Sequence, residues 1–424
     1  MRILIIASGN FYSTYGGGQV YVKNIVDEFI NQKQNIVVFS FVSNILSVEK
    51  SIYRGVELYE IGMKEQQVLE QLIVKIQPDI IHAHSQKALM CTIGKKMHIP
   101  VIVTAHHGGI ICPVGTLLNV KDEVCHLPVC HVNCLSCVLH NIRSGRYWYP
   151  FMKHLPLKLY LSLGKYLAKA PFIPFITPIG MSAIYIHQKQ TEWQSIIKDS
   201  TCLIAPCFAI KEVMARNGLD EKRIIVIPHG IPIFSDVSLS LSIRNKCIKF
   251  FYLGRICYVK GIHVLLQAFH ALRASDVELH LIGGAGNKEE CRYMIRLQKK
   301  YHKDSRIVWH GKVSPEQVSD KIKNMHVSIA PSICLETFGL NIAESLAMGK
   351  PVIATRCGGA EMQIENGVNG WLIASNDVEA LKSKMEDIIR DSSVMHLVRM
   401  NKGVVSIGEH CRSLLELYNR LITR

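Results

Sequence analysis

Residues 330–362 have the sequence APSICLETFGLNIAESLAMGKPVIATRCGGAEM, and the prediction of the fold starts from this stretch. A strand is predicted to end at Ala330 and a helix to begin near Gly339, with Glu336 in the loop between them. The first turn of such a helix offers unpaired N–H groups and the positive end of the helix dipole, both suited to a phosphate. Ionised Glu336 and Glu344 would accept hydrogen bonds from sugar hydroxyls; the alternative is that both are solvated surface glutamates.

Short apolar runs alternate with helical patterns on both sides of this stretch. The predicted strands cover residues 3–7, 35–41, 80–83, 101–105, 201–205, 224–228, 249–253, 278–282, 306–309, 327–330 and 352–354. Segments with helical spacing, such as residues 20–30, 262–272 and 340–348, lie between them. This alternation predicts two doubly wound α/β domains, each a parallel sheet covered by helices on both faces. Because such sheets bind ligands at the carboxyl ends of their strands, we expect a cleft between two facing domains.

The pattern also predicts where the parts of the chain begin and end. We expect an N-terminal domain over residues 1–233, interrupted at 106–149 by a segment rich in cysteine, histidine and glycine. The Ser-rich residues 234–246 are predicted to be a linker at the start of a C-terminal domain over residues 234–400. A closing helix is expected within residues 401–424.

The charge and the apolar pattern of the sequence limit the kinds of molecule that the protein is expected to bind. The 49 Lys and Arg residues exceed the 34 acidic residues, which gives a formal net charge of +15. Nucleic acid is disfavoured because the basic residues are dispersed and no nucleic-acid-binding motif is found, which leaves phosphorylated ligands or an anionic membrane. No secretion signal and no apolar run long enough to span a bilayer are recognised, so a cytoplasmic location is expected. The fourteen cysteines are then expected to be thiols or metal ligands rather than disulfides.

The segment around Glu336 and Glu344 resembles the family 4 retaining glycosyltransferases, which have the GT-B fold of two Rossmann-like domains facing a cleft. Their hallmark is two glutamates separated by seven residues, with Phe-Gly after the first and a Gly-x-Pro-Val element after the helix. Here these are Glu336, Phe338-Gly339, Glu344 and the sequence GKPV at 349–352. One departure is Thr337, where proline is common in the family.

Other motifs resemble the same family in the same order. The sequences LGR at 253–255 and KG at 260–261 resemble its basic pair, which implies that Arg255 and Lys260 neutralise the donor diphosphate. The glycine loop that follows residues 281–282 resembles its nucleotide-side loop. The resemblance implies a donor-binding set of Gly17, Gly18, Gly254, Gly283, Phe338, Gly339, Leu340 and Glu344.

In the N-terminal half, Gly16-Gly17-Gly18 follows Tyr15 between the first strand and the first helix, where backbone amides can cradle an anion. The loop lacks the third glycine of a dinucleotide fingerprint, and the alternative is a flexible helix entry. His106 ends the sequence Thr-Ala-His after a predicted strand, and the resemblance places it near the transferred sugar, in preference to His107. The alternative is a structural histidine.

The absence of any Asp-x-Asp sequence argues against the metal-dependent GT-A class. The resemblance implies transfer of a hexose from a UDP- or GDP-sugar with retention at the anomeric carbon, by front-face substitution and without a catalytic metal. The catalytic set is then His106, Arg255, Lys260 and Glu336, and the acceptor is a glycan, a lipid-linked sugar or a small molecule. The alternatives are a nucleotide-sugar 2-epimerase of the same fold and a non-catalytic sugar-binding partner.

Five cysteines lie within residues 112–137, and Cys134-x-x-Cys137 has metal-ligand spacing. The segment resembles an insertion found in a subset of these transferases. That resemblance implies a structural site formed by Cys112, Cys125, Cys134 and Cys137, with zinc as the metal. Cys130 is then spare, and the alternative is that Cys130 and Cys112 exchange roles. An iron–sulfur cluster needs the same number of ligands, and unligated thiols are the remaining alternative.

Residues 152–169 combine leucines with Lys153, Lys158, Lys165 and Lys169. Such a segment lies on an anionic membrane surface as a peripheral contact, or forms a basic helix that covers the first domain. Membrane-associated members of the family use lipid-linked acceptors, so the resemblance is compatible with the first alternative.

Overall fold

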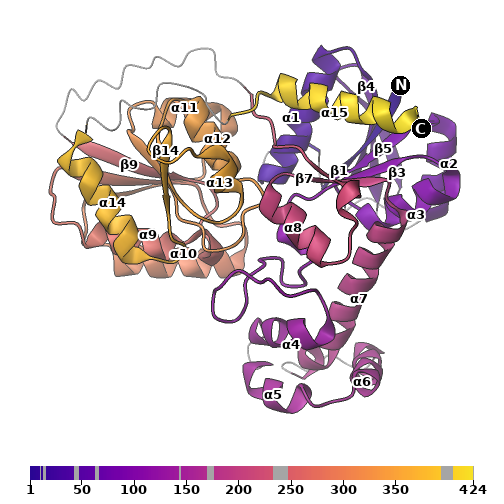
Figure 1. The fold of residues 1–424 in the computed structure, drawn as a ribbon, viewed down its shortest axis with the longest axis horizontal. Helices are drawn as coiled ribbons and strands as arrows, with labels where there is room; N and C mark the ends of the chain where they lie inside the picture. The colour runs from indigo at the N-terminus through magenta and orange to yellow at the C-terminus, as the bar shows by residue number, and fades with distance from the viewer. Residues whose placement is uncertain are drawn as a thin grey trace. The chain divides into compact units, whose positions relative to one another are not determined.

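Apolar runs form the strands of two separate sheets in the computed structural model (Figure 1). The structure describes residues 1–9, 11–12, 16–42, 47–62, 66–142, 145–169, 176–232, 247–392 and 404–423. The chain divides into unit 1, formed by Met1–Ile227 and Cys411–Arg424, and unit 2, formed by Pro228–His410. The predicted boundary at residues 233–234 and the predicted linker at 234–246 lie outside the described residues.

Unit 1 contains an eight-stranded sheet with the order β3-β4-β2-β1-β5-β6-β7-β8. Its strands are β1 (Arg2–Ser8), β2 (Asn35–Val42), β3 (Val48–Tyr53), β4 (Val56–Gly62), β5 (Ile80–Ala83), β6 (Val101–Thr104), β7 (Cys202–Ala205) and β8 (Ile224–Val226). All neighbours pair in parallel except β3, which runs antiparallel to β4. The sequence predicted a purely parallel sheet, but the observed sheet ends in an antiparallel hairpin of β3 and β4. This hairpin was not predicted because β3 is half exposed and lacks the apolar run of a buried strand.

The helices of unit 1 connect these strands. They are α1 (Gly17–Asn31), α2 (Gln66–Ile76), α3 (Lys87–Met97), the 3-10 helix η1 (Gly108–Ile110), α4 (His131–His140), α5 (Gly145–Met152), α6 (Leu157–Lys169), α7 (Thr177–Asp199), α8 (Phe208–Arg216) and η2 (Glu221–Arg223). The Cys-rich segment 106–149 contains η1, α4 and the start of α5, and helices α4 to α7 pack on a small core of their own that includes Leu139, Tyr160 and Ile186. None of the helices in the described part of the chain is long and apolar enough to span a membrane.

Unit 2 contains a six-stranded parallel sheet with the order β11-β10-β9-β12-β13-β14. Its strands are β9 (Ile248–Leu253), β10 (Val277–Ile282), β11 (Ile307–Gly311), β12 (Val327–Ala330), β13 (Val352–Thr355) and β14 (Gly370–Ile373). Its helices are η3 (Tyr258–Lys260), α9 (Ile262–His270), α10 (Lys288–Lys300), α11 (Pro315–Ile322), α12 (Leu340–Ala347), α13 (Gly359–Gln363) and α14 (Val378–Arg390). The prediction of two doubly wound α/β domains is confirmed.

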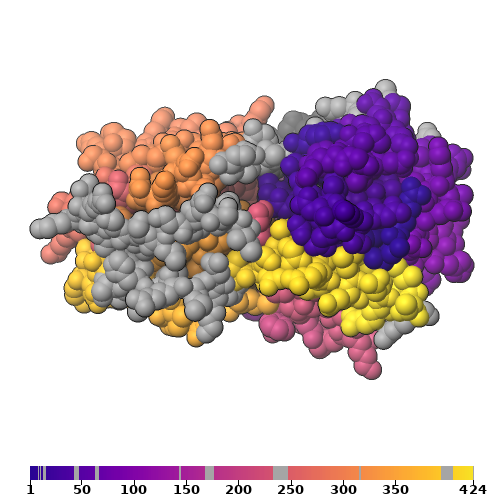
Figure 2. Space-filling model, turned by 90° about the horizontal axis from the view of Figure 1, so that it is seen from above, coloured from indigo at the N-terminus to yellow at the C-terminus, as the bar shows by residue number. Residues whose placement is uncertain are grey.

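The last helix, α15 (Ile407–Ile422), leaves unit 2 and returns to unit 1 from Cys411 onward. Tyr418 on α15 packs its ring against Phe29 of α1, and its hydroxyl lies 2.5 Å from Nδ1 of His82 on β5. Figure 2 shows α15 lying along the N-terminal part of the chain. The C-terminal residues therefore belong to the core of the first sheet domain.

Each sheet has one point where the strand order reverses. In unit 1 this point lies between β1 and β5, and in unit 2 it lies between β9 and β12. Ligands of doubly wound sheets bind beyond the carboxyl ends of the strands at this point. The loops that follow β1, β5, β9 and β12 are therefore the first place to look for functional side chains.

The loop after β9 is packed tightly against the end of β12. Gly261, with φ 68°, begins α9, and a Cβ atom on it would lie 1.8 Å from the carbonyl oxygen of Pro331. The N–H of Ile333 donates to the carbonyl oxygen of Val259 at 2.9 Å. Glycine at position 261 is thus required by its left-handed backbone and by the approach of a second backbone segment.

These two requirements can be separated by substitution. Gly311 has a similar φ of 73°, but a Cβ atom there would meet nothing within 4 Å. We expect Gly311→Ala to cost only the left-handed penalty of about 1–2 kcal/mol. Gly261→Ala should cost clearly more because Pro331 must move. Thermal unfolding followed by circular dichroism checks this order, and equal losses of Tm would contradict it.

Candidate functional site

An ion pair between Lys260 and Glu336 lies at the reversal point of unit 2. Lys260 Nζ donates to Glu336 Oε1, and the hydroxyl of Ser332 donates to the same oxygen. The side chains of Lys260 and Glu336 are only 22% and 15% exposed. The structure therefore brings together two residues that were predicted separately, one after β9 and one after β12.

Both members of the pair are held in their charged forms. Burial acts to raise the pKa of Glu336, but Lys260, Ser332 and Arg255 outweigh it, so the pKa is lowered. Burial acts to lower the pKa of Lys260, but Glu336 and nearby thiols outweigh it, so the pKa is raised. Glu336 is consequently a carboxylate at neutral pH, an acceptor for hydroxyl groups rather than a proton donor.

Backbone contacts fix the position of Glu336. Its N–H donates to the carbonyl oxygen of Cys357 at 2.7 Å, and its own carbonyl oxygen accepts from the N–H of Gly359 at 3.0 Å. A Cβ atom on Gly359 would lie 2.1 Å from the carbonyl oxygen of Phe338. The Gly-Gly pair after β13 thus allows one loop to lie directly on the other.

The start of α12 has the properties of an anion site. Its N-cap residue Gly339 has φ 84°, no side chain caps the helix, and its first turn contains no acidic residue. The N–H groups of the first turn are therefore not satisfied by a side-chain cap, and the helix dipole adds positive potential there. Phe338 is buried against the ring of His229, which fixes the approach of the loop to the helix.

Arg255 lies in the same loop as Lys260 and is paired with a residue that sequence reasoning missed. Its guanidinium lies 3.3 Å from Glu290 Oε1, and the other Glu290 oxygen accepts from the N–H of Gly286 at 2.6 Å. Gly254 and Gly283 allow the two loops to touch, because a Cβ atom on Gly283 would lie 1.8 Å from the carbonyl oxygen of Gly254. No sequence motif marked Glu290, because its partner lies on another strand connection.

Glu344 lies one turn into α12 and differs from Glu336 in its surroundings. No hydrogen bond or ion pair reaches its carboxylate from the residues that the structure describes. Burial raises the pKa of Glu344 to about 7. The carboxylate is thus available to a ligand, whose hydroxyl groups would favour its ionised form.

In unit 1 the predicted residues also meet at the reversal point. A Cβ atom on Gly18 would lie 3.8 Å from the side chain of His106, so the glycine loop after β1 borders the histidine after β6. His106 Nε2 lies 2.8 Å from Nδ1 of His84, and both rings contact Tyr21 of α1. His84 was missed, although its place directly after β5 is a signal that could have found it.

The neighbouring His107 has a local structural role, because its Nδ1 accepts from the N–H of Gly109 at 3.0 Å and caps η1. The choice of His106 over His107 is therefore compatible with the geometry. Gly17 begins α1 next to Gly18. Tyr15, the first residue of the predicted motif, lies outside the described residues.

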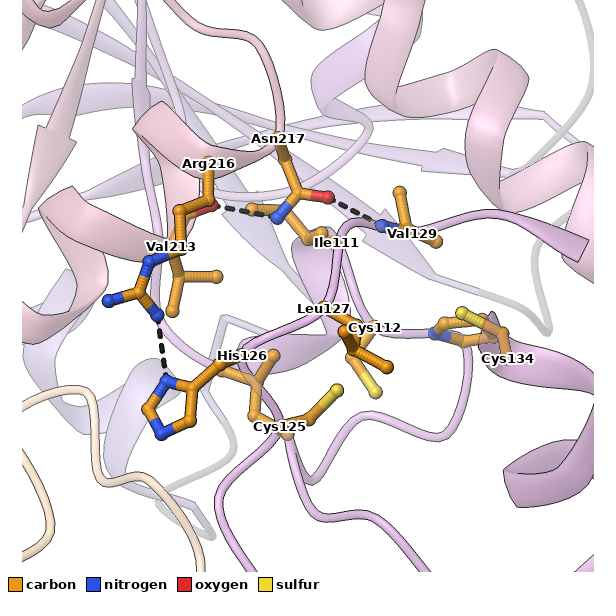
Figure 3. A pocket seen from close by; sticks show the side chains of 12 residues that line it. Ile111, Cys112, Cys125, His126, Leu127, Val129, Cys134, Val213, Arg216 and Asn217 are labelled. Atoms are coloured by element: carbon orange, nitrogen blue, oxygen red, sulfur yellow. Dashed lines mark hydrogen bonds between the residues drawn. The ribbon is translucent and has the colours of Figure 1, made fainter. Parts of the chain in front are cut away.

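The cysteines of the segment that follows η1 are near one another. Cys112, Cys125 and Cys134 line one pocket, together with His126, which is hydrogen-bonded to Arg216 at 2.7 Å (Figure 3). Cys137 lies one turn after Cys134 on α4. In the described parts of the chain, however, no three Cys, His, Asp or Glu side chains are arranged to hold a metal ion as they stand.

Two doubly wound sheets, with cations, a carboxylate and an uncapped helix start at the reversal point of the second, define the GT-B class of glycosyltransferase folds. Residues 15–119 match the family model described as Glycosyltransferase Family 4, and residues 239–403 match the model described as Glycosyl transferases group 1. Together these models match well over half of the chain. The chain belongs to the family 4 glycosyltransferases.

The curated relatives named below are also glycosyltransferases. A D-inositol 3-phosphate glycosyltransferase of Xylanimonas cellulosilytica is 28% identical over 213 residues, which are 47% of this chain and 51% of the relative. The capsular polysaccharide biosynthesis glycosyltransferase CapM of Staphylococcus aureus is 31% identical over 158 residues, 35% of this chain and 39% of the relative. The chain thus spans about half the length of these relatives or less.

Solved structures confirm the fold over nearly the whole chain. HepE from Anabaena, in complex with UDP and glucose, has a TM-score of 0.65 at 14% identity and covers 98% of this chain and 99% of its own. The sucrose-phosphate synthase of Thermosynechococcus elongatus has a TM-score of 0.68 at 17% identity, with 100% and 99% covered. At these sequence identities the structural similarity shows the fold alone.

The buried carboxyl of Glu344 makes the stability of the protein depend on pH. Because the pKa of Glu344 is raised in the folded chain to about 7, its contribution to stability is fully present below the unfolded pKa, about 4.3, and is lost as pH rises through 7. Glu344→Gln cannot ionise and should escape this loss. We expect its Tm to exceed that of the parent by a few degrees at pH 8.5 and by much less at pH 5.

Differential scanning calorimetry at the two pH values tests this expectation. Glu379→Gln, which changes an exposed carboxylate on α14, serves as the control and should shift Tm equally at both. A pH-independent difference between Glu344→Gln and the parent would show that Glu344 does not titrate in this range.

Proposed function

We propose that this protein transfers a hexose from a nucleotide-diphosphate sugar to an acceptor, with retention of configuration and without a catalytic metal. The observation that carries the proposal is the cluster at the β9/β12 reversal point. There the Lys260–Glu336 pair, Arg255 and the uncapped start of α12 come from two connections of one sheet, the one after β9 and the one after β12. This arrangement offers cations and N–H donors for a diphosphate, and carboxylates for the hydroxyls of a sugar and a ribose.

Each group has a distinct part in the proposed transfer. Arg255, Lys260 and the N–H groups at Gly339 and Leu340 stabilise the negative charge that develops on the leaving diphosphate. Glu336 is held as a carboxylate by Lys260 and Ser332, so we assign it to a sugar hydroxyl rather than to attack on the anomeric carbon. Without a protein nucleophile, retention follows from front-face substitution, in which the leaving phosphate takes the proton of the acceptor hydroxyl.

His106 is proposed to contact the transferred sugar from unit 1, where its hydrogen bond to His84 fixes the orientation of its ring. Gly17 and Gly18 lie at the start of α1 and would let a ligand approach the backbone there. Gly254 and Gly283 are proposed to border the nucleotide, because they permit the close packing of the two loops next to Arg255.

For the donor we propose a UDP- or GDP-sugar. The complex of HepE with UDP and glucose supports a uridine nucleotide by analogy. The acceptor is proposed to be a glycan, a lipid-linked sugar or a small molecule, and the names of the relatives, which range from inositol phosphate to capsular polysaccharide, support this breadth. We propose a cytoplasmic location, with peripheral contact to the membrane where a lipid-linked acceptor resides.

Removal of either member of the central ion pair tests the transferase proposal. Lys260→Ala and Glu336→Ala should each lower transfer by about two orders of magnitude or more, because each removes an interaction with charge or hydroxyls at the reacting end of the donor. The measurement is transfer of labelled sugar from UDP-glucose and GDP-mannose to a glycan acceptor pool. Circular dichroism should show that both variants fold.

The control is Lys249→Ala, because Lys249 forms a 2.9 Å ion pair with Glu278 at the opposite end of the same strand β9. It should keep full activity. Full activity of Lys260→Ala would contradict the assignment of Lys260 to the donor diphosphate. If the parent converts the sugar nucleotide without any acceptor, the result favours the 2-epimerase. If the parent binds the donor without turnover, the result favours a non-catalytic sugar-binding partner.

We further propose that Cys112, Cys125, Cys134 and Cys137 hold a structural metal, zinc in preference to an iron–sulfur cluster. The thiols fit such a role in their placement, because Cys112, Cys125 and Cys134 line one pocket and Cys137 lies one turn after Cys134 on α4. Burial raises the pKa of Cys134 to about 12 and also raises that of Cys137, so a bound divalent cation would have to stabilise their thiolates. Because no three of these sulfurs lie in ligand positions as they stand, metal binding requires a rearrangement of the described cysteines.

Metal analysis of anaerobically purified protein tests this site. Near-stoichiometric zinc is expected in the parent and a loss of metal in Cys134→Ser with Cys137→Ser. Cys130→Ser is the matched control, because Cys130 caps α4 by accepting from the N–H of Asn133, a role that serine also fills. Absence of both zinc and iron from the parent would contradict the proposal.

A further inference from the structure

The helices inserted between β6 and β7 form a strongly basic part of unit 1. Residues 124–191 contain seven Lys and Arg residues and no Asp or Glu, whereas the whole chain has a formal net charge of +15. Within unit 1, Figure 1 shows α4, α5 and α6 gathered at the end of α7 that points away from the sheet. Nearly half of the excess positive charge is therefore concentrated in one small subdomain.

One face of α6 packs against α7. The hydroxyl of Tyr160 donates to the carbonyl oxygen of Ile179 at 2.9 Å. A Cβ atom on Gly164 would lie 2.7 Å from the carbonyl oxygen of Gly180, so the two helices approach closely there. Because this face is fixed inward, the other face of α6 points away from the core.

Several large apolar side chains of α5 and α6 are exposed, and we call them the α5–α6 surface. Phe151 is 73% exposed and Tyr166 is 71% exposed. The other members of the surface are Tyr147, Trp148, Leu159 and Leu163. Single exposed apolar residues are ordinary, but a group of this size on two consecutive helices usually marks a contact site.

Basic side chains accompany this surface without acidic partners. Lys153, Lys158 and Lys165 are exposed, and in the described parts of the chain no carboxylate lies within ion-pair distance of them. The side chain of Lys169, predicted to belong to the same set, lies outside the described residues. The lysines are thus available to an external anion.

We propose that the α5–α6 surface docks on a bilayer that contains anionic lipid. Aromatic side chains suit the level of the headgroups, leucines suit the first part of the acyl region, and lysines suit the lipid phosphates. Nucleic acid would satisfy the lysines and could stack on the aromatic rings, but it would leave Leu159 and Leu163 without an apolar partner, which the acyl region of a bilayer supplies. The inference deepens the membrane contact in the proposed function, but it uses no residue of the donor cluster.

Sedimentation of the full chain with phosphatidylcholine vesicles, with and without phosphatidylglycerol, tests the charge requirement. Binding is expected only with the anionic lipid and should weaken in high salt. Lys158→Glu with Lys165→Glu should lower partitioning by at least about tenfold. Lys299→Glu with Lys303→Glu, on and after α10, makes the same change in net charge and should bind as the parent does.

The apolar requirement is tested with Phe151→Ser, and Phe208→Ser is its matched control, since Phe208 is 60% exposed on α8 of the same unit. Only Phe151→Ser should lower binding. The tryptophan emission of the parent should shift to the blue with anionic vesicles. The shift should be absent in Trp148→Phe, because Trp193 is fully buried already and the other two tryptophans, Trp309 and Trp371, lie on strands of unit 2.

Equal binding by the lysine variant and its control would overturn the proposal, as would an unchanged blue shift in Trp148→Phe. Displacement from vesicles by RNA, with tighter binding to RNA than to lipid, would assign the surface to nucleic acid instead. Sugar transfer to a soluble acceptor should be the same in all these variants, so loss of membrane binding and failure of the transferase assignment are distinguishable.

Discussion

The Lys260–Glu336 ion pair joins the connection after β9 to the connection after β12, and the rest of the candidate site is arranged around it. Two charges that are largely removed from water are stable only when each has its partner and further hydrogen bonds, which Ser332 supplies here. To bring the pair together, two loops must pack backbone on backbone. Glycine at 261 and at 359 allows this, since any side chain there would strike Pro331 or Phe338. The two glycines are therefore a structural condition for the Lys260–Glu336 ion pair.

The positive groups at the site already have protein partners: Lys260 is paired with Glu336, and Arg255 with Glu290. A diphosphate must therefore compete with Glu290 for Arg255, whose side chain is 55% exposed and free to turn toward a ligand. The uncapped start of α12 has no such competitor, because its first turn contains no acidic residue. In the proposed transfer the helix start is accordingly the fixed part of the phosphate site and Arg255 is the adjustable part.

Much of this arrangement could be predicted because it is encoded locally. The strand, loop and helix around Glu336 are contiguous, and the order of motifs along the chain matches a family pattern, so Arg255, Lys260 and Glu344 could be named before their positions were known. Glu290 could not, because its partner Arg255 lies on another strand connection. His84 was missed although its place directly after β5 could have marked it. The hairpin of β3 and β4 was missed because β3 is half exposed and lacks an apolar run. A basic helix was anticipated within residues 152–169, where α6 lies, but helices α4, α5 and α7 were missed because their core is shared among four helices, which weakens the periodicity of each.

The distribution of charge bears on both the proposed donor site in unit 2 and the proposed membrane contact of the inserted helices. An excess of basic residues could serve either a phosphorylated ligand or an anionic surface, and the sequence alone leaves both open. In unit 2 the cations next to the proposed donor phosphates are balanced by carboxylates, so they add little to the net charge of +15. In residues 124–191 no acidic residue balances the seven basic ones. Nearly half of the net positive charge of the chain therefore lies in this one segment, where it would orient α5 and α6 toward an anionic bilayer before any contact forms.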